Sequence, residues 1–290
     1  METKSFKNIL VVGIGLIGGS VLRNLSENKF KGHLYGLDLN EDIISEAHEL
    51  GLIENNKKKL PEINGDCLVV LSVPSLSIEK AISLVRENLS FQRILFTDTF
   101  SAKTKVLAYL NSDPDLSRRF ILSHPIAGSE KSGLANSSHS LFQNKLVILS
   151  PHELNLKDDL ARIQNFWEQL GSKVVLLDPI KHDSIFAKTS HLPHALAYAL
   201  MNFLYSDLEF NTFRYSGGSL EDYTRIASSN SIMWKDIMVS NKDELLKAIE
   251  GFKTSLDKIS DLIERGDSES IKEFLDFVKQ ARDDLIKQKD

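Results

Sequence analysis

The sequence has little of what marks secreted, membrane or nucleic-acid-binding proteins. Its 290 residues contain one cysteine, Cys67, which excludes a disulfide framework and indicates a reducing cytoplasm. No apolar stretch approaches the roughly 20 residues that span a bilayer. The first residues lead almost directly into a predicted strand, which leaves no room for a signal peptide. The net charge is −5 and the longest basic run is residues 57–59, so no nucleic-acid surface is expected.

What is present predicts an α/β domain followed by helices. Hydrophobic residues make up 42% of the chain, enough for a sizeable core. Strands alternate with helices up to residue 178, which predicts a doubly wound parallel sheet over 1–178 and an all-helical domain over 179–290. The predicted strands are 8–12, 33–37, 67–73, 93–96, 120–122, 142–149 and 173–177. The direction of the last two is left open.

A glycine-rich turn follows the first strand. In this turn Gly13 permits the tight bend, Gly15 lets the backbone approach a pyrophosphate, and Gly18 allows close packing of helix on strand. Asp38, at the end of the second strand, is placed to bind ribose hydroxyls and to repel a 2′-phosphate, which favours NAD over NADP. Leu16 and Ile17 complete the predicted cofactor loop. The alternative is a glycine turn in an unrelated α/β protein.

Further polar residues follow strand ends and should meet at one edge of the sheet. Ser72, Val73 and Pro74 come after the third strand and are predicted to contact the cofactor. Ser101 follows the fourth strand, where it can also cap a helix over 102–110. His124 follows the fifth strand, and its ordinary pKa of about 6.5 suits it to accept a proton near neutral pH. A hydrogen-bonded structural histidine is the other interpretation.

The helical half contains one apolar helix and two polar patches. Residues 195–204 are apolar on almost every side, which predicts burial against a second copy of the chain in a homodimer. The patch at 188–194 contains His191 and His194 but no cysteine or paired carboxylate that would complete a metal site, so no metal is predicted. In the second patch Arg225 suits the capture of a carboxylate, with an ion-paired surface arginine as the alternative.

Together these motifs resemble the prephenate/arogenate dehydrogenase family of tyrosine biosynthesis. The resemblance implies a Rossmann-type dinucleotide-binding domain, an all-α domain for dimerisation and substrate binding, and an NAD-dependent oxidative decarboxylation of prephenate. It is carried by VGIGLIGGS at 12–20, SHPIAGSE at 123–130, SHLPH at 190–194 and DYTRIA at 222–227.

The resemblance also implies roles for single residues. His124 corresponds to the catalytic histidine of the family and Ser101 to its supporting serine. The substrate-binding positions correspond to Ser190, His191, His194 and Arg225. Glu221 stands where many relatives carry a basic residue, and an acid there could favour the ammonium of arogenate, so arogenate dehydrogenase is an alternative. A different reductase of the same plan and a non-catalytic NAD(H)-binding redox sensor are more distant alternatives.

Overall fold

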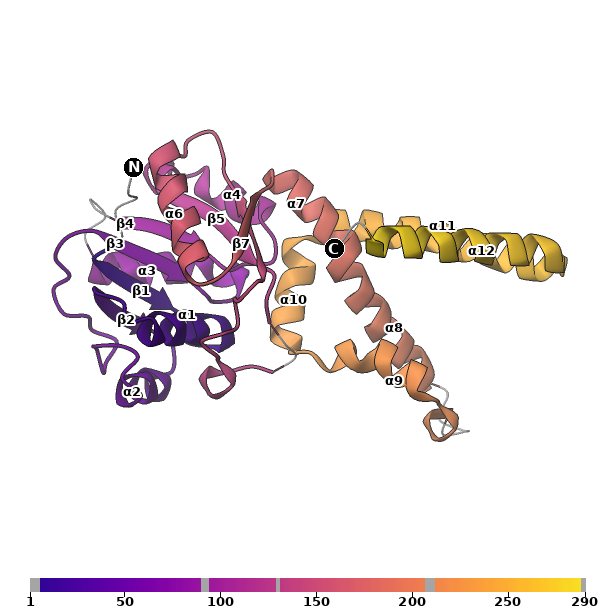
Figure 1. Ribbon diagram of the computed structural model, residues 1–290, viewed down its shortest axis with the longest axis horizontal. Coiled ribbons are helices and arrows are strands. Elements are labelled where there is room, and N and C mark those ends of the chain that lie inside the picture. Colours follow the sequence, from indigo (N-terminus) through magenta and orange to yellow (C-terminus); the bar gives the residue numbers. More distant parts are fainter. Residues whose placement is uncertain (1–5, 90–93, 129–130, 207–211, 288–290) are drawn as a thin grey trace. The chain divides into compact units, whose positions relative to one another are not determined.

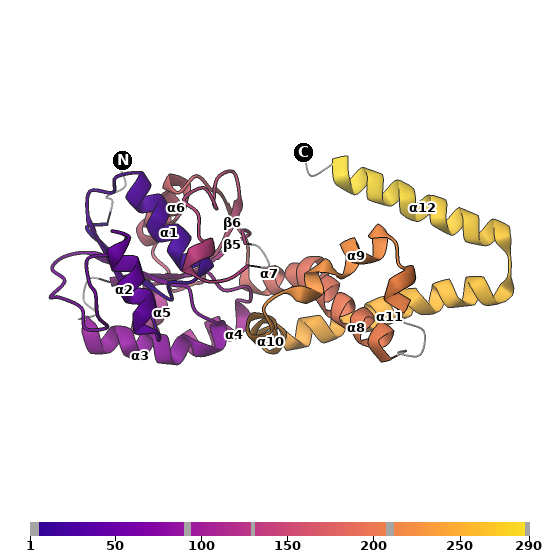
Figure 2. The ribbon, with the colours of Figure 1, turned by 90° about the horizontal axis from the view of Figure 1, so that it is seen from below.

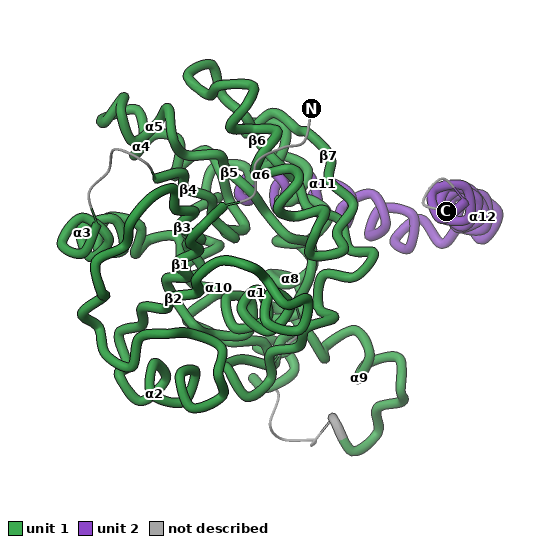
Figure 3. Tube along the Cα trace, turned by 60° about the vertical axis from the view of Figure 1, so that its left-hand side comes forward, with its two compact units in different colours: residues 1–244 green, residues 245–290 purple. Residues whose placement is uncertain are grey.

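A computed structural model of the chain describes residues 6–89, 94–128, 131–206 and 212–287 (Figure 1). It divides into two compact units, residues 1–244 and residues 245–290 (Figure 3). The first unit contains a sheet with its covering helices and a set of shorter helices. The second contains the greater part of two long helices.

The first unit is built on one seven-stranded sheet with the order β2-β1-β3-β4-β5-β6-β7. The five strands from β2 to β5 in this order run parallel, whereas β6 is antiparallel to β5 and β7 runs parallel to β6. The strands are β1 (Asn8–Val12), β2 (His33–Leu37), β3 (Cys67–Leu71), β4 (Ile94–Asp98), β5 (Phe120–Pro125), β6 (Leu146–Ser150) and β7 (Lys173–Leu176). The sheet is therefore of mixed direction, and only its first five strands are doubly wound.

Alternating side chains of each strand feed two separate cores. In β1, Ile9 and Val11 pack into one apolar cluster, while Leu10 and Val12 pack into the other. The first cluster contains residues of α1, α2 and α6, and the second contains residues of α3, α4 and α5. Figure 2 shows α1 and α6 on one side of the sheet and α3 on the other. Burial on both faces explains why these strands read as continuous apolar runs.

The helices of this sheet domain follow the predicted pattern closely. Asn40 caps α2 by accepting a hydrogen bond from the Asp42 amide, and Gly51 follows that helix at a φ of 68°. The bounds are α1 (Leu16–Glu27), α2 (Glu41–Glu49), α3 (Ile78–Asn88), α4 (Thr104–Leu110), α5 (Pro114–Arg118) and α6 (Lys157–Gln169), with short turns η1 (Ser75–Ser77) and η3 (Leu134–Asn136).

Two local predictions in the sheet domain are wrong. Ser101 does not cap the next helix, because α4 begins at Thr104. The Asp183 carboxylate accepts the hydrogen bonds from the amides of Lys103 and Thr104 instead. The strand expected over 142–149 begins only at Leu146, since Asn144 adopts a positive φ of 59° and holds the preceding residues in a turn.

The first unit continues with helices from residue 179. Asp178 caps α7 through the amides of Ile180 and Lys181, and Pro179 occupies the first helical position. A π-helical turn, η4, separates α7 from α8. The bounds are α7 (Pro179–Phe186), η4 (Ala187–His191), α8 (Leu192–Ser206), η6 (Thr212–Tyr215), α9 (Gly218–Thr224), η7 (Arg225–Ser228) and α10 (Ser231–Ser240).

The apolar helix α8 is not enclosed by its own chain. Only Ala197 of α8 is buried, and Phe203 and Tyr205 are 69% and 70% exposed. The single chain therefore leaves most of this apolar helix uncovered, and its burial against a second copy of the chain stays a prediction.

The second unit contains α12 (Ser268–Lys287) and most of α11 (Lys242–Arg265), whose first three residues belong to the first unit. Gly266, at a φ of 64°, lies between them. No helix of the described ranges is both long and apolar enough to cross a membrane.

Candidate active site

The glycine-rich turn lies where β1 leads into α1. Gly13 has a φ of 91°, and a Cβ there would lie 2.5 Å from the Ser72 carbonyl oxygen. A Cβ at Gly18 would lie 2.0 Å from the carbonyl oxygen of Gly13. A Cβ at Gly15, in contrast, would meet no atom of the described chain within 4 Å. Two glycines are thus required by internal packing, and the third leaves open space beside the N-terminus of α1.

The predicted cofactor residues gather around this turn. Ser72 pairs with β1 through its amide, which donates to the Val12 carbonyl at 2.7 Å, and Val73 contacts the same turn. The Asp38 carboxylate accepts a hydrogen bond from the Ile14 amide at 2.9 Å, so it also shapes the turn. Leu16 and Ile17 form the start of α1, while Pro74 is exposed between β3 and η1. These residues all follow the carboxyl ends of β1, β2 or β3.

His124 is the second-to-last residue of β5, within the strand rather than after it as predicted, and lies at the same edge of the sheet. Its side chain is almost buried, with 8% of the residue exposed. Burial lowers the pKa of His124 well below 6.5, and the nearby rings of His182 and His191 and the ammonium of Lys103 lower it further. The imidazole is therefore neutral at pH 7 and able to accept a proton. Ser129 and Glu130, which end the same sequence motif, lie outside the described residues.

His124 is hydrogen-bonded to a histidine of α7, which is in turn hydrogen-bonded to an aspartate of the same helix. His124 Nδ1 lies 2.9 Å from His182 Nε2, and His182 Nδ1 lies 2.8 Å from a carboxylate oxygen of Asp183. Phe186 packs against both rings, with centroid distances of 4.8 Å and 4.5 Å. Ser101, the partner expected for the imidazole, lies half-buried between β4 and α4.

A fully buried ion pair lies beneath the histidine. The Lys103 ammonium donates to the Asp98 carboxylate and to the Ser123 carbonyl oxygen, and none of these groups is exposed. The other Asp98 oxygen accepts a hydrogen bond from the Ser123 amide at 2.8 Å. Both backbone polar groups of Ser123, the residue before His124, are thus fixed by hydrogen bonds.

The two histidines predicted for substrate binding both contact Trp234 of α10. His194 stacks on the Trp234 ring with centroids 3.6 Å apart, and His191 meets the ring edge-on at 6.1 Å. His191 is fully buried, with Nδ1 3.0 Å from the Asn241 amide nitrogen, and burial lowers its pKa to about 4. His194 Nδ1 donates to the Ser190 carbonyl oxygen at 2.9 Å, which leaves Nε2 available to a ligand.

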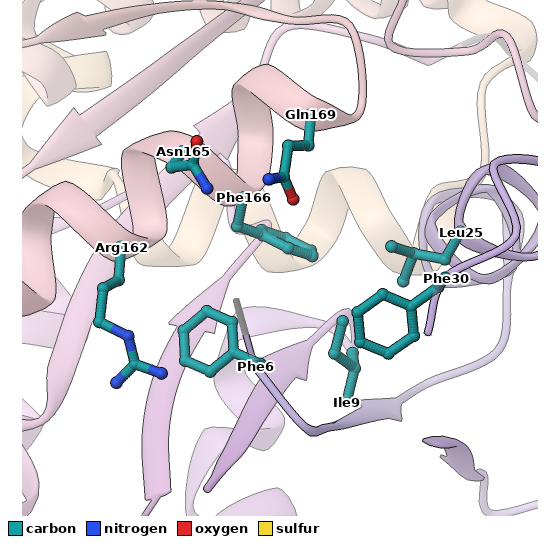
Figure 4. A pocket seen from close by; sticks show the side chains of 8 residues that line it. All are labelled: Phe6, Ile9, Leu25, Phe30, Arg162, Asn165, Phe166 and Gln169. Carbon is teal, nitrogen blue, oxygen red and sulfur yellow. The ribbon is translucent and has the colours of Figure 1, made fainter. Parts of the chain in front are cut away.

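Arg225 lies at the start of η7, beside an open hollow of about 590 Å³. Burial lowers the pKa of His194, and the charge of the nearby Arg225 guanidinium lowers it further. A second hollow, of about 10 Å³, has room for about one water molecule and is partly closed by Arg162 lying over Phe6 (Figure 4). Only the larger hollow can take a small organic ligand. It is lined by Tyr198, Met201, Glu221, Asp222, Thr224, Arg225, Ala227 and Ser228.

The glycine-rich turn and His124 lie at the carboxyl edge of the same parallel strands. His191 and His194 both pack on Trp234, and the charge of Arg225 reaches His194. His182 and Asp183 are additional members that the sequence analysis did not single out. Their only sequence signal is the Asp178-Pro179 helix start, which places them in the first turns of α7. The described residues contain no group of three or more histidine, cysteine, aspartate or glutamate side chains suited to a metal ion.

Comparison with known proteins gives a consistent result. The chain matches the nucleotide-binding domain of prephenate dehydrogenase over residues 21–176 and the prephenate dehydrogenase dimerization domain over residues 178–277. A prephenate dehydrogenase of Bacillus subtilis is 30% identical over 283 residues, which covers 96% of this chain and 76% of that protein.

Two solved structures are similar over nearly their whole length. Prephenate dehydrogenase from A. aeolicus, in complex with hydroxyphenyl propionate and NAD+, has a TM-score of 0.88 and 37% identity, covering 98% of this chain and 100% of that one. Synechocystis arogenate dehydrogenase has a TM-score of 0.79 and 25% identity, with 96% and 99% covered. The predicted fold class is confirmed, and the chain belongs to the prephenate dehydrogenase family.

Proposed function

We propose that this chain is an NAD-dependent prephenate dehydrogenase, which converts prephenate to 4-hydroxyphenylpyruvate and carbon dioxide. The reaction removes a hydride from C4 of the ring and a proton from the C4 hydroxyl. The observation that carries the proposal is a neutral, nearly buried His124 at the sheet edge that also holds the glycine-rich turn. A proton acceptor and a dinucleotide site at one edge are what such an oxidation needs.

The residues around the turn fit the dinucleotide. The open space at Gly15 admits a pyrophosphate to the free amides at the start of α1, where the helix dipole favours negative charge. The Asp38 carboxylate at the end of β2 suits ribose hydroxyls and disfavours a 2′-phosphate, which supports NAD over NADP. When bound, NAD+ accepts the hydride from C4.

His124 takes the proton in this scheme. As C4 loses its hydride and the C4–O bond becomes a carbonyl, the His124 imidazole accepts the hydroxyl proton. The bond between the ring and its carboxylate then breaks, and its electron pair makes the ring aromatic. The same imidazole returns the proton to the ring oxygen, so the product is a phenol. Ser101, half-buried near the end of β4, is proposed to assist at the nicotinamide side.

Arg225, His194 and Ser190 are proposed to hold the substrate. Prephenate carries two carboxylates, and a guanidinium beside a hollow can pair with one of them through two parallel hydrogen bonds. His194 Nε2 can bind a further polar group of the substrate, because Nδ1 is used by the Ser190 carbonyl. His191 is proposed to support Trp234, because the two rings meet edge-on.

Arogenate is the second candidate substrate. Glu221 and Asp222 line the same hollow as Arg225, and two carboxylates there would favour the ammonium that distinguishes arogenate from prephenate. The similarity to Synechocystis arogenate dehydrogenase supports arogenate as a candidate substrate.

A homodimer formed through the helical region is proposed as the working assembly. The exposed apolar side chains of α8 and the match to a dimerization domain over 178–277 support it. The free, buried Cys67 supports the cytoplasm as the compartment. Sedimentation velocity at micromolar concentration tests the assembly, and a monomer would rule it out.

The activity is tested by following NADH formation with prephenate and arogenate, each with NAD+ and NADP+. Turnover should be fastest with prephenate and NAD+. His124→Asn should lower kcat by about 10²- to 10⁴-fold, the usual contribution of a general base, with NAD+ affinity unchanged. No turnover of either substrate by the wild-type enzyme would overturn the proposal.

A further inference from the structure

The donors around Asp183 determine which nitrogen of His182 carries a proton. The Asp183 carboxylate accepts hydrogen bonds from the Lys103 amide and the Thr104 amide, each at 2.8 Å, and from the Thr104 hydroxyl. Burial alone would raise the pKa of Asp183, but these bonds and the one from His182 outweigh it and lower the pKa. An ionised carboxylate has no proton to donate. The 2.8 Å contact therefore requires a proton on His182 Nδ1.

The same reasoning extends to His124. Burial lowers the pKa of His182, so that ring is neutral at pH 7 and has a lone pair on Nε2. His124 Nδ1, 2.9 Å away, must then be the donor. Since His124 is also neutral, its own lone pair lies on Nε2, the nitrogen that His182 does not contact. The Asp183 carboxylate therefore sets the tautomer of His124 through His182.

We propose that His182 and Asp183 are positioning residues that hold His124 in this tautomer, and that His182 takes up a proton while His124 acts as base. The proposal rests on the function proposed above. When the substrate O–H bond breaks and an N–H bond forms at His124 Nε2, the His124 Nδ1–H bond breaks and an N–H bond forms at His182 Nε2. The transfer reverses when the ring oxygen is protonated, so no proton is gained or lost.

The charges around the two rings favour this shift. His182 directly contacts the Asp183 carboxylate, so a positive charge on that ring is paired. The Lys103 ammonium lies near both rings and lowers the pKa of each, but at His182 the carboxylates of Asp183 and Asp98 oppose it. His124 has no carboxylate in contact among the described residues. A buried charge is costly unless it is paired, and the proton is therefore more stable on His182 than on His124.

Two substitutions at His182 separate orientation from proton uptake. His182→Phe removes the acceptor, and we expect kcat to fall about 100-fold with the KM values for prephenate and NAD+ within about threefold of wild type. His182→Gln keeps an oxygen that can accept from His124 Nδ1 but cannot take up a proton. Its kcat should lie between wild type and His182→Phe. His33→Gln, which removes an exposed histidine of β2, is the matched control and should leave kcat unchanged.

Nitrogen NMR of histidine-labelled protein gives a measurement independent of turnover. In the wild type, His124 should show a protonated Nδ1 and an unprotonated Nε2, with its signals assigned by their loss in His124→Asn. The preference should persist in His182→Gln and disappear in His182→Phe. A proton on His124 Nε2, or full kcat in His182→Phe, would overturn the proposed proton transfer from His124 to His182 even if prephenate is turned over. If the wild type fails to turn over prephenate, the spectra still decide which nitrogen of His124 carries the proton.

Discussion

Asp236 of α10 accepts hydrogen bonds from the Ser75 hydroxyl at 2.7 Å and from the Leu76 amide at 3.0 Å. Ser240, one turn later, lies 2.8 Å from the same hydroxyl. The helix that carries Trp234 is thereby fixed to the turn that follows the predicted cofactor residues of β3. The predicted cofactor residues and the predicted substrate residues are thereby connected through one helix within the first unit.

Removal of this connection should affect both stability and cofactor binding. In Asp236→Ala, the Ser75 hydroxyl and Leu76 amide lose their acceptor, which costs roughly 1–3 kcal/mol of unfolding free energy. We expect the KM for NAD+ to rise about tenfold, the equivalent of about 1.4 kcal/mol. Urea unfolding and kinetics measure the two effects. Asp257→Ala, at an exposed aspartate of α11, is the control, and equal effects in both variants would contradict the role of Asp236.

The pH dependence of turnover should reflect the lowered pKa of His124. The neutral imidazole is the active form, and its pKa is lowered by burial and by His182, Lys103 and His191. As pH falls from 8, kcat/KM for prephenate should stay constant through 6.5 and decrease only below it. A decrease centred at or above 6.5 would show that the base is a solvated histidine.

The free energy of unfolding should also decrease as pH falls, because of His191. The pKa of His191 is lowered from 6.5 to about 4 in the fold, so the unfolded chain binds the proton more tightly. Its contribution is therefore fully present above pH 6.5 and is lost as pH falls toward 4, with a total of roughly 3 kcal/mol. Urea unfolding at pH 7 and pH 5 measures this loss. The loss should be smaller in His191→Leu, and an equal loss would rule out His191 as its source.

Arg225→Gln should weaken substrate binding more than turnover. The glutamine can form hydrogen bonds but cannot neutralise a carboxylate, so we expect the KM for prephenate to rise about 10- to 100-fold, or about 1.4–2.8 kcal/mol. The KM for NAD+ should not change. Steady-state kinetics with both substrates varied provides the measurement, and an unchanged KM for prephenate would remove Arg225 from the site.

Asp38→Ser should reduce the preference for NAD+. Without the carboxylate, the 2′-phosphate of NADP+ is no longer repelled, and the ratio of kcat/KM for NAD+ over NADP+ should fall about tenfold or more. Because Asp38 also accepts from the Ile14 amide, Asp38→Asn is needed as a second variant that keeps an acceptor for the turn. Unchanged selectivity in both variants would contradict the role of Asp38.

The parts of the site that were predictable from sequence are those determined by local chain geometry. Gly13 and Gly18 could be assigned because a tight turn and close helix packing require glycine at those spacings, and the structure shows both constraints. His124 could be placed because parallel strands bring their carboxyl ends to one edge. The functional roles of these residues stay predictions.

The missed residues act across long separations in sequence. Asp183 caps α4, which lies about 80 residues earlier, and Asp236 binds Ser75 across 161 residues. No local pattern encodes such contacts. Ser101 was assigned as the cap of α4 because serine is favoured at helix starts, but the carboxylate of Asp183 takes that place.

The π-helical turn at Ala187–His191 gives the backbone between α7 and α8 an irregular length. Each residue of an α-helix advances the side-chain direction by about 100°. Deletion of one residue from this turn would therefore rotate His194 away from Trp234 while leaving His182 in place on α7. Homologous chains and engineered variants should consequently keep the length of 187–191 unchanged, since the turn sets the angular phase between the two halves of the site.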